Sequence, residues 1–109
     1  MKTFFFDSIY NTQEFALKEL SSEPIFVTSF SQEKGKGTSN REWLNADQGI
    51  ACSLALFEEQ IKIAHTLIPL VAGFAFVKVF QDIDLTLKWP NDIILNEKKV
   101  GGISVSYTH

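Results

Sequence analysis

Three segments typical of β-strands follow one another near the end of the chain, and very short connections separate them. Leu85–Trp89, Asp92–Leu95 and Val100–Tyr107 are rich in aliphatic or aromatic side chains. The first connection contains Pro90, which favours an extended residue before it, and the second is Asn96-Glu97-Lys98. Because connections this short join antiparallel neighbours, the sequence predicts an antiparallel sheet at this end of the chain.

The first half of the chain contains three more segments with strand character. Phe4–Phe6, Ile25–Phe30 and Ile50–Phe57 are dominated by β-branched and aromatic residues. The turn-forming pair Asp7-Ser8 should end the first of them, because both side chains can bond to nearby backbone groups. Together with the strands at the end of the chain, these segments predict a mixed, mainly antiparallel sheet.

Two helices are predicted between these strands. The first should begin at Asn11 or Thr12, because either side chain offers an oxygen to the unpaired amides of a first turn, and Pro24 should end it. The second covers roughly Ile61–Gln81, as one long helix or as two that meet near Pro69, because apolar residues recur there at helical spacing. The sequence therefore predicts an α+β fold with a mixed, mainly antiparallel sheet, in which residues 1–109 form one domain or part of one.

Composition and charge argue against several classes of function. The 109 residues carry a formal net charge of −3, whereas a general nucleic-acid binder has an excess of cations. The single cysteine, Cys52, cannot form an internal disulfide, and its apolar surroundings predict that it is buried. No apolar run is long enough to cross a bilayer. We therefore expect a cytoplasmic protein that does not associate with membranes.

A polar segment from Ser31 to Gln48 interrupts the strands and helices. Within it, Gly35-Lys36-Gly37 lets backbone amides approach a ligand closely, and the lysine together with Arg41 can neutralise phosphate. The spacing matches neither a Walker A motif nor a dinucleotide-binding fingerprint. The segment is therefore either a loop that closes over a nucleotide or an ordinary solvated surface loop.

Two further motifs place lysines beside unusual backbone. Lys88-Trp89-Pro90-Asn91-Asp92 should hold its lysine and its aspartate at the mouth between two strands, although an ordinary hairpin turn with a core tryptophan has the same pattern. Gly101 and Gly102 sit together in a strand, where glycine marks a bulge or the close approach of another molecule. Lys99 precedes them, and it either stabilises charge that develops at a reaction centre or is a solvated hairpin lysine.

In this order, the three motifs resemble the catalytic domain of biotin protein ligases, also called biotin-[carboxylase] ligases or holocarboxylase synthetases. That family's pattern runs from Ser-Thr-Asn through Gly-Arg-Gly-Arg-Arg-Gly-Arg-x-Trp to Lys-Trp-Pro-Asn-Asp and Lys-Leu-Ala-Gly-Ile. The resemblance covers nearly all of this chain but about the first half of the family's domain. It implies a truncated form of the class II synthetase-like biotin/lipoate ligase fold.

The resemblance implies that biotin is activated by ATP and Mg²⁺ to biotinyl-5′-AMP. The biotinyl group is then passed to a lysine of a biotin carboxyl carrier protein, such as that of acetyl-CoA carboxylase. By the same resemblance, Lys99 is the catalytic residue. The positions implied to bind biotin are Asn11, Thr12, Gln32, Gly35, Lys36, Gly37, Trp43, Lys99, Gly101 and Gly102. Those implied to bind ATP or the adenylate are Lys36, Arg41, Trp43, Lys88, Asn91 and Asp92, and the metal position is Asp92.

The chain departs from the family pattern in its motifs. Ser-Thr-Asn reads Asn11-Thr12-Gln13 here, which leaves the register of this motif open. Thr38 and Ser39 replace two arginines of the loop and lower its positive charge, so looser retention of the adenylate is expected. There is no helix-turn-helix segment, so DNA binding as a repressor is not expected.

Nothing here corresponds to the family's later Gly-Ile-Asn segment. We therefore expect a fragment that is inactive alone or that completes itself with a second copy as a homodimer. Two alternatives remain open. One is a lipoate or octanoyl transferase of the same fold, and the other is a non-catalytic module that associates with itself through an open strand.

Overall fold

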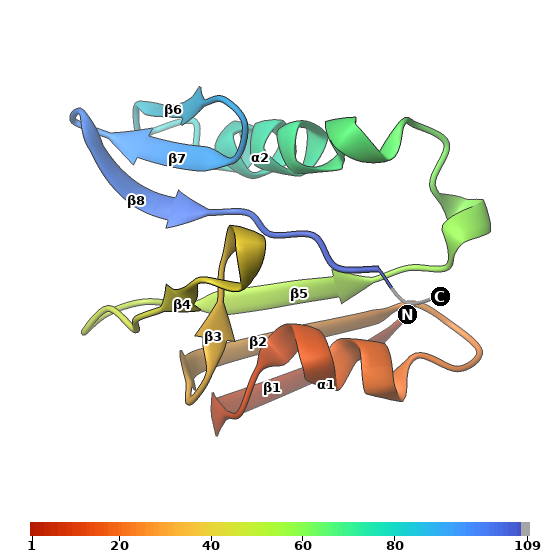
Figure 1. The fold of residues 1–109 in the computed structure, drawn as a ribbon. Helices are drawn as coiled ribbons and strands as arrows, with labels where there is room; N and C mark the ends of the chain where they lie inside the picture. Colours follow the sequence, from red (N-terminus) through yellow and green to blue (C-terminus); the bar gives the residue numbers. More distant parts are fainter. Residues whose placement is uncertain (108–109) are drawn as a thin grey trace. The chain divides into compact units, whose positions relative to one another are not determined.

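The computed structural model describes residues 1–107, which divide into two compact units. Unit 1 contains residues 1–36, 40–62 and 106–107, and unit 2 contains residues 37–39 and 63–105. Each unit combines one α-helix with β-strands that pair among themselves (Figure 1). None of the helices in the described residues has the length and apolar content that crossing a membrane requires.

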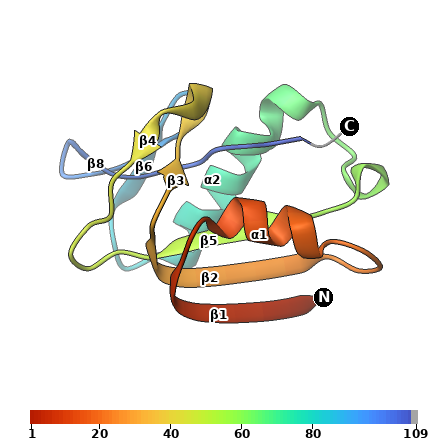
Figure 2. The same ribbon diagram turned by 60° about the horizontal axis from the view of Figure 1, so that its bottom comes forward.

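Unit 1 is built on a three-stranded sheet with a helix on one face (Figure 2). β1 (Lys2–Ile9) runs parallel to β2 (Ile25–Gln32), and β2 pairs antiparallel with β5 (Ala51–Ala55). The connection between the parallel strands is the helix α1 (Thr12–Glu19), which packs back onto the sheet. The core between helix and sheet consists of Ala16, Ile25, Val27 and Ala55, with Phe4, Phe6, Phe15 and Leu20 packed against it.

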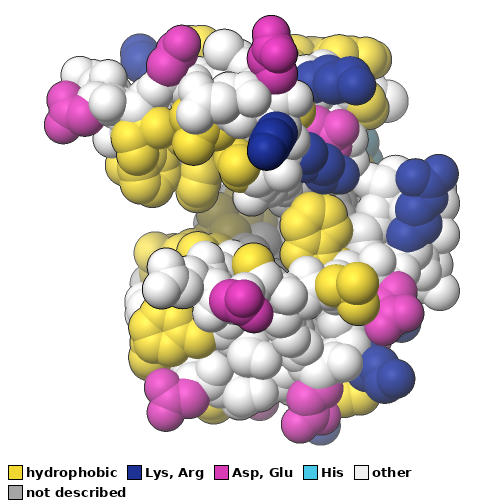
Figure 3. Space-filling model, turned by 90° about the vertical axis from the view of Figure 1, so that its left-hand side faces the viewer, with side chains coloured by type: hydrophobic (Ala, Val, Ile, Leu, Met, Phe, Trp, Pro, Cys, Tyr) yellow, Lys and Arg dark blue, Asp and Glu magenta, His cyan; other side chains and the backbone are white. Residues whose placement is uncertain are grey.

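The phenylalanines of β1 alternate across the sheet as strand geometry requires. Phe4 and Phe6 face the helix, where the ring of Phe15 meets each of them edge-on at 5.1 Å between centroids. Phe5 lies on the opposite face, 58% exposed, and packs edge-on against Phe30. Figure 3 shows that hydrophobic side chains form part of the molecular surface, next to basic and acidic side chains.

The polar segment after β2 contains more regular structure than expected. β3 (Gly35–Lys36) pairs with β4 (Glu42–Trp43) around the 3₁₀ turn η1 (Thr38–Asn40). Beyond β4, the side chain of Asn45 accepts a hydrogen bond from the amide of Gln32 at 3.0 Å and donates one to its carbonyl at 2.7 Å. An amide side chain thus completes the backbone hydrogen bonds at the end of β2, as a neighbouring strand would.

Unit 2 packs a helix against a three-stranded antiparallel sheet. The sheet consists of β6 (Leu85–Lys88), β7 (Asp92–Leu95) and β8 (Lys98–Gly102), in that order. The helix α2 (Ile68–Val79) approaches it closely at Gly73, where an added Cβ would lie 2.8 Å from side-chain carbons of both Leu87 and Ile103. Two short 3₁₀ turns, η2 (Glu58–Gln60) and η3 (His65–Leu67), precede this helix.

The predicted α+β class with mixed, mainly antiparallel pairing is confirmed, but several boundaries were wrong. β1 continues through Asp7-Ser8 to Ile9, because both polar side chains face solvent while the backbone keeps pairing with β2. The second helix is shorter than expected and starts so that Pro69 lies in its first turn, where a missing amide hydrogen costs nothing. β8 ends at Gly102, which pairs with the first residue of β7, so no partner residue remains for a longer strand.

The expectation that Cys52 is buried is also wrong, since its side chain is exposed. β5 alternates its side chains across the sheet, and Ala55 faces the core beneath α1. Cys52 lies at odd spacing from Ala55 and therefore points to the other face, toward Thr28 on β2. An apolar neighbourhood in sequence says little about burial when a strand has one open face.

The turn between β7 and β8 allows a test of backbone strain. Asn96 and Glu97 form a two-residue connection with φ values of 50° and 66°, and positive φ at both positions is typical of a type I′ hairpin. Asparagine tolerates this region, whereas glutamate adopts it at a cost in free energy. We expect Glu97→Gly to raise the free energy of unfolding by about 1 kcal/mol, measured by urea denaturation. The control Glu97→Ala removes the same charge but keeps the Cβ, and an equal gain in both variants would contradict a backbone origin.

Candidate functional site

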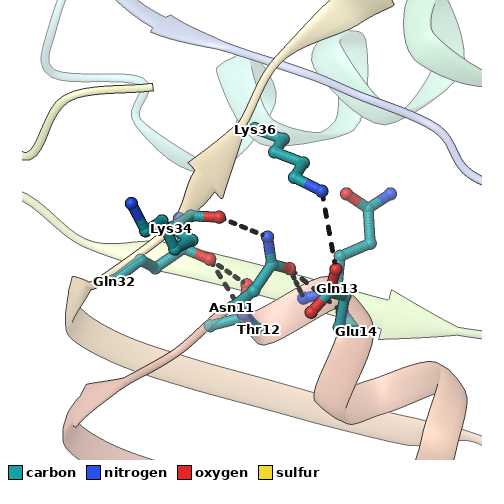
Figure 4. Close-up of polar contacts among 7 residues, drawn as sticks. All are labelled: Asn11, Thr12, Gln13, Glu14, Gln32, Lys34 and Lys36. Carbon is teal, nitrogen blue, oxygen red and sulfur yellow. Dashed lines mark hydrogen bonds and ion pairs between the residues drawn. The ribbon is translucent and has the colours of Figure 1, made fainter. Parts of the chain in front are cut away.

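A buried asparagine organises the start of α1. Asn11 is 4% exposed, and its Oδ1 accepts hydrogen bonds from the amides of Gln13 and Glu14, each at 3.0 Å (Figure 4). Its Nδ2 donates to the carbonyl of Lys34 at 2.7 Å. The first contacts satisfy amides that a helix start leaves unpaired. The last one ties the helix to the segment that leads into β3.

Thr12 forms the centre of a second set of contacts in unit 1. Its amide and its hydroxyl both donate to Oε1 of Gln32, at 2.8 and 3.0 Å, and its Oγ1 lies 2.8 Å from the hydroxyl of Ser53. A hydroxyl has one hydrogen. Because that of Thr12 goes to Gln32, Ser53 must be the donor in the remaining bond. Three elements, α1, β2 and β5, thereby meet in one polar cluster under the helix start.

The glycine-rich segment lies directly beside this cluster. Gly35 is buried, and a Cβ at this position would sit 2.8 Å from Nε2 of Gln32 and 3.2 Å from the carbonyl oxygen of Trp43. Only glycine therefore leaves the side chain of Gln32 in its place. The next residue, Lys36, approaches Glu14 of α1 at 3.7 Å, with both side chains about half exposed. Such a pair contributes little stability, and the lysine can exchange its partner for another anion.

In unit 2, the register of the sheet gathers charges at the turn end of the β6–β7 hairpin. Lys88 pairs with Asp92 across β6 and β7, and Asp92 pairs with Gly102 across β7 and β8. Nζ of Lys99 reaches Oδ1 of Asp92 at 2.9 Å, with 47% and 24% of the two side chains exposed. Two ammonium groups and one carboxylate therefore belong to the same end of the sheet, as the motif predicts. The side chain of Trp89 is 65% exposed. It is therefore not part of the core, unlike the tryptophan in the alternative of an ordinary hairpin turn.

A β-bulge accompanies the glycine pair. The partner of Ile93 is Gly101, whereas the partner of Ile94 is Lys99, so Val100 is an extra residue in β8. A bulge twists the strand and redirects the neighbouring side chains. The prediction that the two glycines mark an irregular strand is thus confirmed. Lys99 lies just before this irregularity.

Asn91 connects three parts of unit 2. Its Nδ2 donates to Oγ1 of Thr38 at 2.6 Å and to the carbonyl of Ile103 at 3.1 Å, while its own carbonyl accepts from the amide of Ile103 at 3.0 Å. Both side-chain hydrogens are therefore committed within the protein. The oxygen Oδ1 is the part of the side chain that this arrangement leaves for a hydrogen-bond donor or a cation.

The residues singled out from the sequence fall into two groups. In unit 1, α1, β2 and the β3–β4 hairpin hold Asn11, Thr12, Gln32, Gly35, Lys36 and Trp43. In unit 2, the η1 segment and the three-stranded sheet hold Gly37, Lys88, Asn91, Asp92, Lys99, Gly101 and Gly102. Arg41 lies between η1 and β4 and is exposed.

Sequence reasoning missed three partners of these residues. Ser53 was hidden in an apolar run, although it alternates with Ala51 and Ala55 on the face toward α1. Glu14 and Thr38 gave no signal, because each meets its partner only through folding. The alternation of side chains along β5 would have placed Ser53 on the face toward α1. No feature of the neighbouring sequence identifies Glu14 or Thr38 as a partner.

The metal position can be tested against the donors that are present. No group of three or more His, Cys, Asp or Glu residues among those described could hold a metal ion. Mg²⁺ is usually held by one or two carboxylates together with substrate phosphates. Asp92 offers one carboxylate, and its Oδ1 already faces the ammonium of Lys99. The residues fit an ion held mainly by a nucleotide, with Asp92 as its protein contact.

Comparison with known proteins gives a consistent result. Residues 5–109 match the Biotin/lipoate A/B protein ligase family. The chain is 34% identical over 105 residues to the bifunctional ligase/repressor BirA of Bacillus spizizenii, covering 89% of this chain and 32% of that protein. It is 30% identical over 98 residues to the biotin-[acetyl-CoA-carboxylase] ligase of Paracoccus denitrificans, covering 85% of this chain and 41% of that protein.

Solved structures extend the similarity to the fold. The biotin acetyl coenzyme A carboxylase synthetase of Helicobacter pylori, crystallised with bound biotinylated ATP, superposes with a TM-score of 0.86 at 29% identity. The match covers 99% of this chain and 56% of that chain. This chain therefore spans about half of the solved structure and less than half of the two relatives above.

The cap of α1 provides a test of the unit 1 cluster. Asn11→Ala removes both cap bonds and leaves the carbonyl of Lys34 without its donor, so the free energy of unfolding should fall by about 2 kcal/mol. Asn11→Ser keeps an acceptor for the helix amides and loses only the bond to Lys34, so its loss should be smaller. Urea denaturation of both variants measures the difference. Equal losses would show that the cap itself contributes nothing.

Proposed function

Because the chain belongs to the Biotin/lipoate A/B protein ligase family, we propose that it is part of a biotin protein ligase. Such an enzyme uses ATP to convert biotin to biotinyl-5′-AMP and then transfers the biotinyl group to a lysine of a biotin carboxyl carrier protein. The observation that carries the proposal is the ion pair of Lys99 and Asp92 at the turn end of the Lys-Trp-Pro-Asn-Asp hairpin. We propose the cytoplasm as its location.

The chemistry of adenylation explains why a lysine belongs at this position. A carboxylate oxygen of biotin attacks the α-phosphorus of ATP, a new P–O bond forms, and the bond to pyrophosphate breaks. Both reactants are anions, and negative charge accumulates on the oxygens between them. An ammonium held there stabilises the transition state more than the separated reactants. Lys99 is suited to this role because Asp92 holds its chain in one place while about half of its surface stays accessible.

Transfer makes different demands on the site. The amine of the acceptor lysine attacks the acyl carbon of the adenylate, an amide forms, and AMP leaves while the amine loses a proton. The carboxylate of Asp92 and the ammonium of Lys88 flank this region of the sheet. When bound, Mg²⁺ would supply further positive charge to the phosphates, with Asp92 as its protein contact. We propose contacts to the nucleotide for Lys36, Arg41, Trp43 and Asn91 as well.

We propose that the unit 1 cluster recognises the polar ring of biotin. Thr12 and Gln32 supply hydroxyl and amide groups whose positions are set by three structural elements. Asn11 uses its side chain within the protein, so it supports this role by positioning Thr12. We propose that Asn11 occupies the place of serine in the family's Ser-Thr-Asn motif, because both residues are good helix caps and Asn11 caps α1. Thr12 then aligns with the threonine of that motif.

Binding and exchange measurements test the proposal. Biotin should bind to the chain in calorimetry, and Lys99→Ala, made in the complete enzyme, should lower biotin-dependent ATP–pyrophosphate exchange by about 100-fold or more. Lys98→Ala removes the neighbouring exposed lysine of the same strand and should leave both measurements nearly unchanged.

Three results would count against the proposal. Preferential binding of lipoate or octanoate would favour the transferase of the same fold. Concentration-dependent self-association without any binding of biotin or ATP would favour the non-catalytic module. Equal effects of the two lysine variants would contradict the role of Lys99.

A further inference from the structure

The glycine-rich segment adopts an unfavourable backbone conformation at its tip. Ser39 and Asn40 have φ values of 59° and 62°, so two consecutive residues other than glycine occupy the left-handed region. Such conformations persist only where surrounding contacts hold them. In the family pattern, the position of Asn40 is the third glycine of the arginine-rich motif, and asparagine also tolerates this region, so the strain falls mainly on Ser39. Something in this chain must hold the tip in place.

The contact that does so joins two residues far apart in sequence. Oγ1 of Thr38, directly before the left-handed pair, accepts a hydrogen bond of 2.6 Å from Nδ2 of Asn91. Asn91 is itself fixed by its bonds to the backbone of Ile103, on the far side of the β7–β8 hairpin. Residues 37–39 accordingly group with unit 2, which carries Lys99.

We propose that Thr38 and Asn91 form a positioning pair that anchors the tip of the glycine-rich segment to the sheet of unit 2 before any ligand binds. The family pattern has an arginine where this chain has Thr38, and an arginine has no acceptor for the amide of Asn91. A neutral hydrogen bond to the protein therefore replaces a cation that would face phosphate. The consequence for function rests on the proposed adenylation: this chain retains its nucleotide by a tip fixed in advance, with less dependence on charge.

Trypsin provides a direct test without any ligand, because it cleaves after Lys36 and Arg41, on either side of the tip. Loss of one exposed hydrogen bond should raise the population of the open tip about fivefold. We therefore expect Thr38→Val, which has the same shape but no acceptor, to be cleaved about fivefold faster at these sites. Thr38→Ser keeps the hydroxyl and should stay within about twofold of the unmodified chain. Thr86→Val, at an exposed position of β6, is the matched control.

Two internal references separate a local effect from general unfolding. Cleavage after Lys18 in α1 and after Lys78 in α2 requires those helices to open, so neither rate should change in Thr38→Val. In an Asn91→Ala background, the further change Thr38→Val should have no additional effect, because the partner is already gone.

The proposal is overturned if Thr38→Val and Thr38→Ser are cleaved at the same rate, or if the helix sites accelerate equally. It is also overturned if the two substitutions act independently. None of these outcomes depends on biotin or ATP. A failure of this proposal is thus distinguishable from a failure of the proposed function.

Discussion

An antiparallel register brings opposite charges together at one end of the sheet in unit 2. β6, β7 and β8 place Lys88, Asp92 and Gly102 in one row, and the bulge at Val100 accompanies the ion pair between Lys99 and Asp92. Because side chains in a strand alternate between faces, a slip by one residue would separate these groups. The chemical proposals for unit 2 depend on this register.

The buried polar side chains of unit 1 have hydrogen-bond partners within the described part of the chain. Asn11 and Thr12 are almost inaccessible, yet each makes several hydrogen bonds to α1, β2 or the segment before β3. Among the described residues, no buried side-chain nitrogen or oxygen lacks a partner. Such networks define a single arrangement, because losing one member leaves another group without a partner.

The glycine-rich segment shows how one stretch of sequence serves two purposes. Gly35 is required by space, since a side chain there would displace Gln32. Ser39 and Asn40 instead adopt a conformation that glycine would adopt more easily, and the hydrogen bond from Asn91 to Thr38 offsets this strain. The segment is therefore shaped by tertiary contacts at its tip and by local packing at its base.

The sequence by itself determined the α+β class, the hairpins at the end of the chain, a helix cap at Asn11 or Thr12 and an irregular strand at the glycine pair. These follow from local chemistry: alternation, short turns, capping oxygens and glycine in a strand act over a few residues. Only the tertiary structure decided that Ser53 joins Thr12, that Thr38 meets Asn91, and that Cys52 is exposed. Those outcomes depend on strand register and on which face of a sheet is covered, and both are set by contacts between residues that lie far apart along the chain.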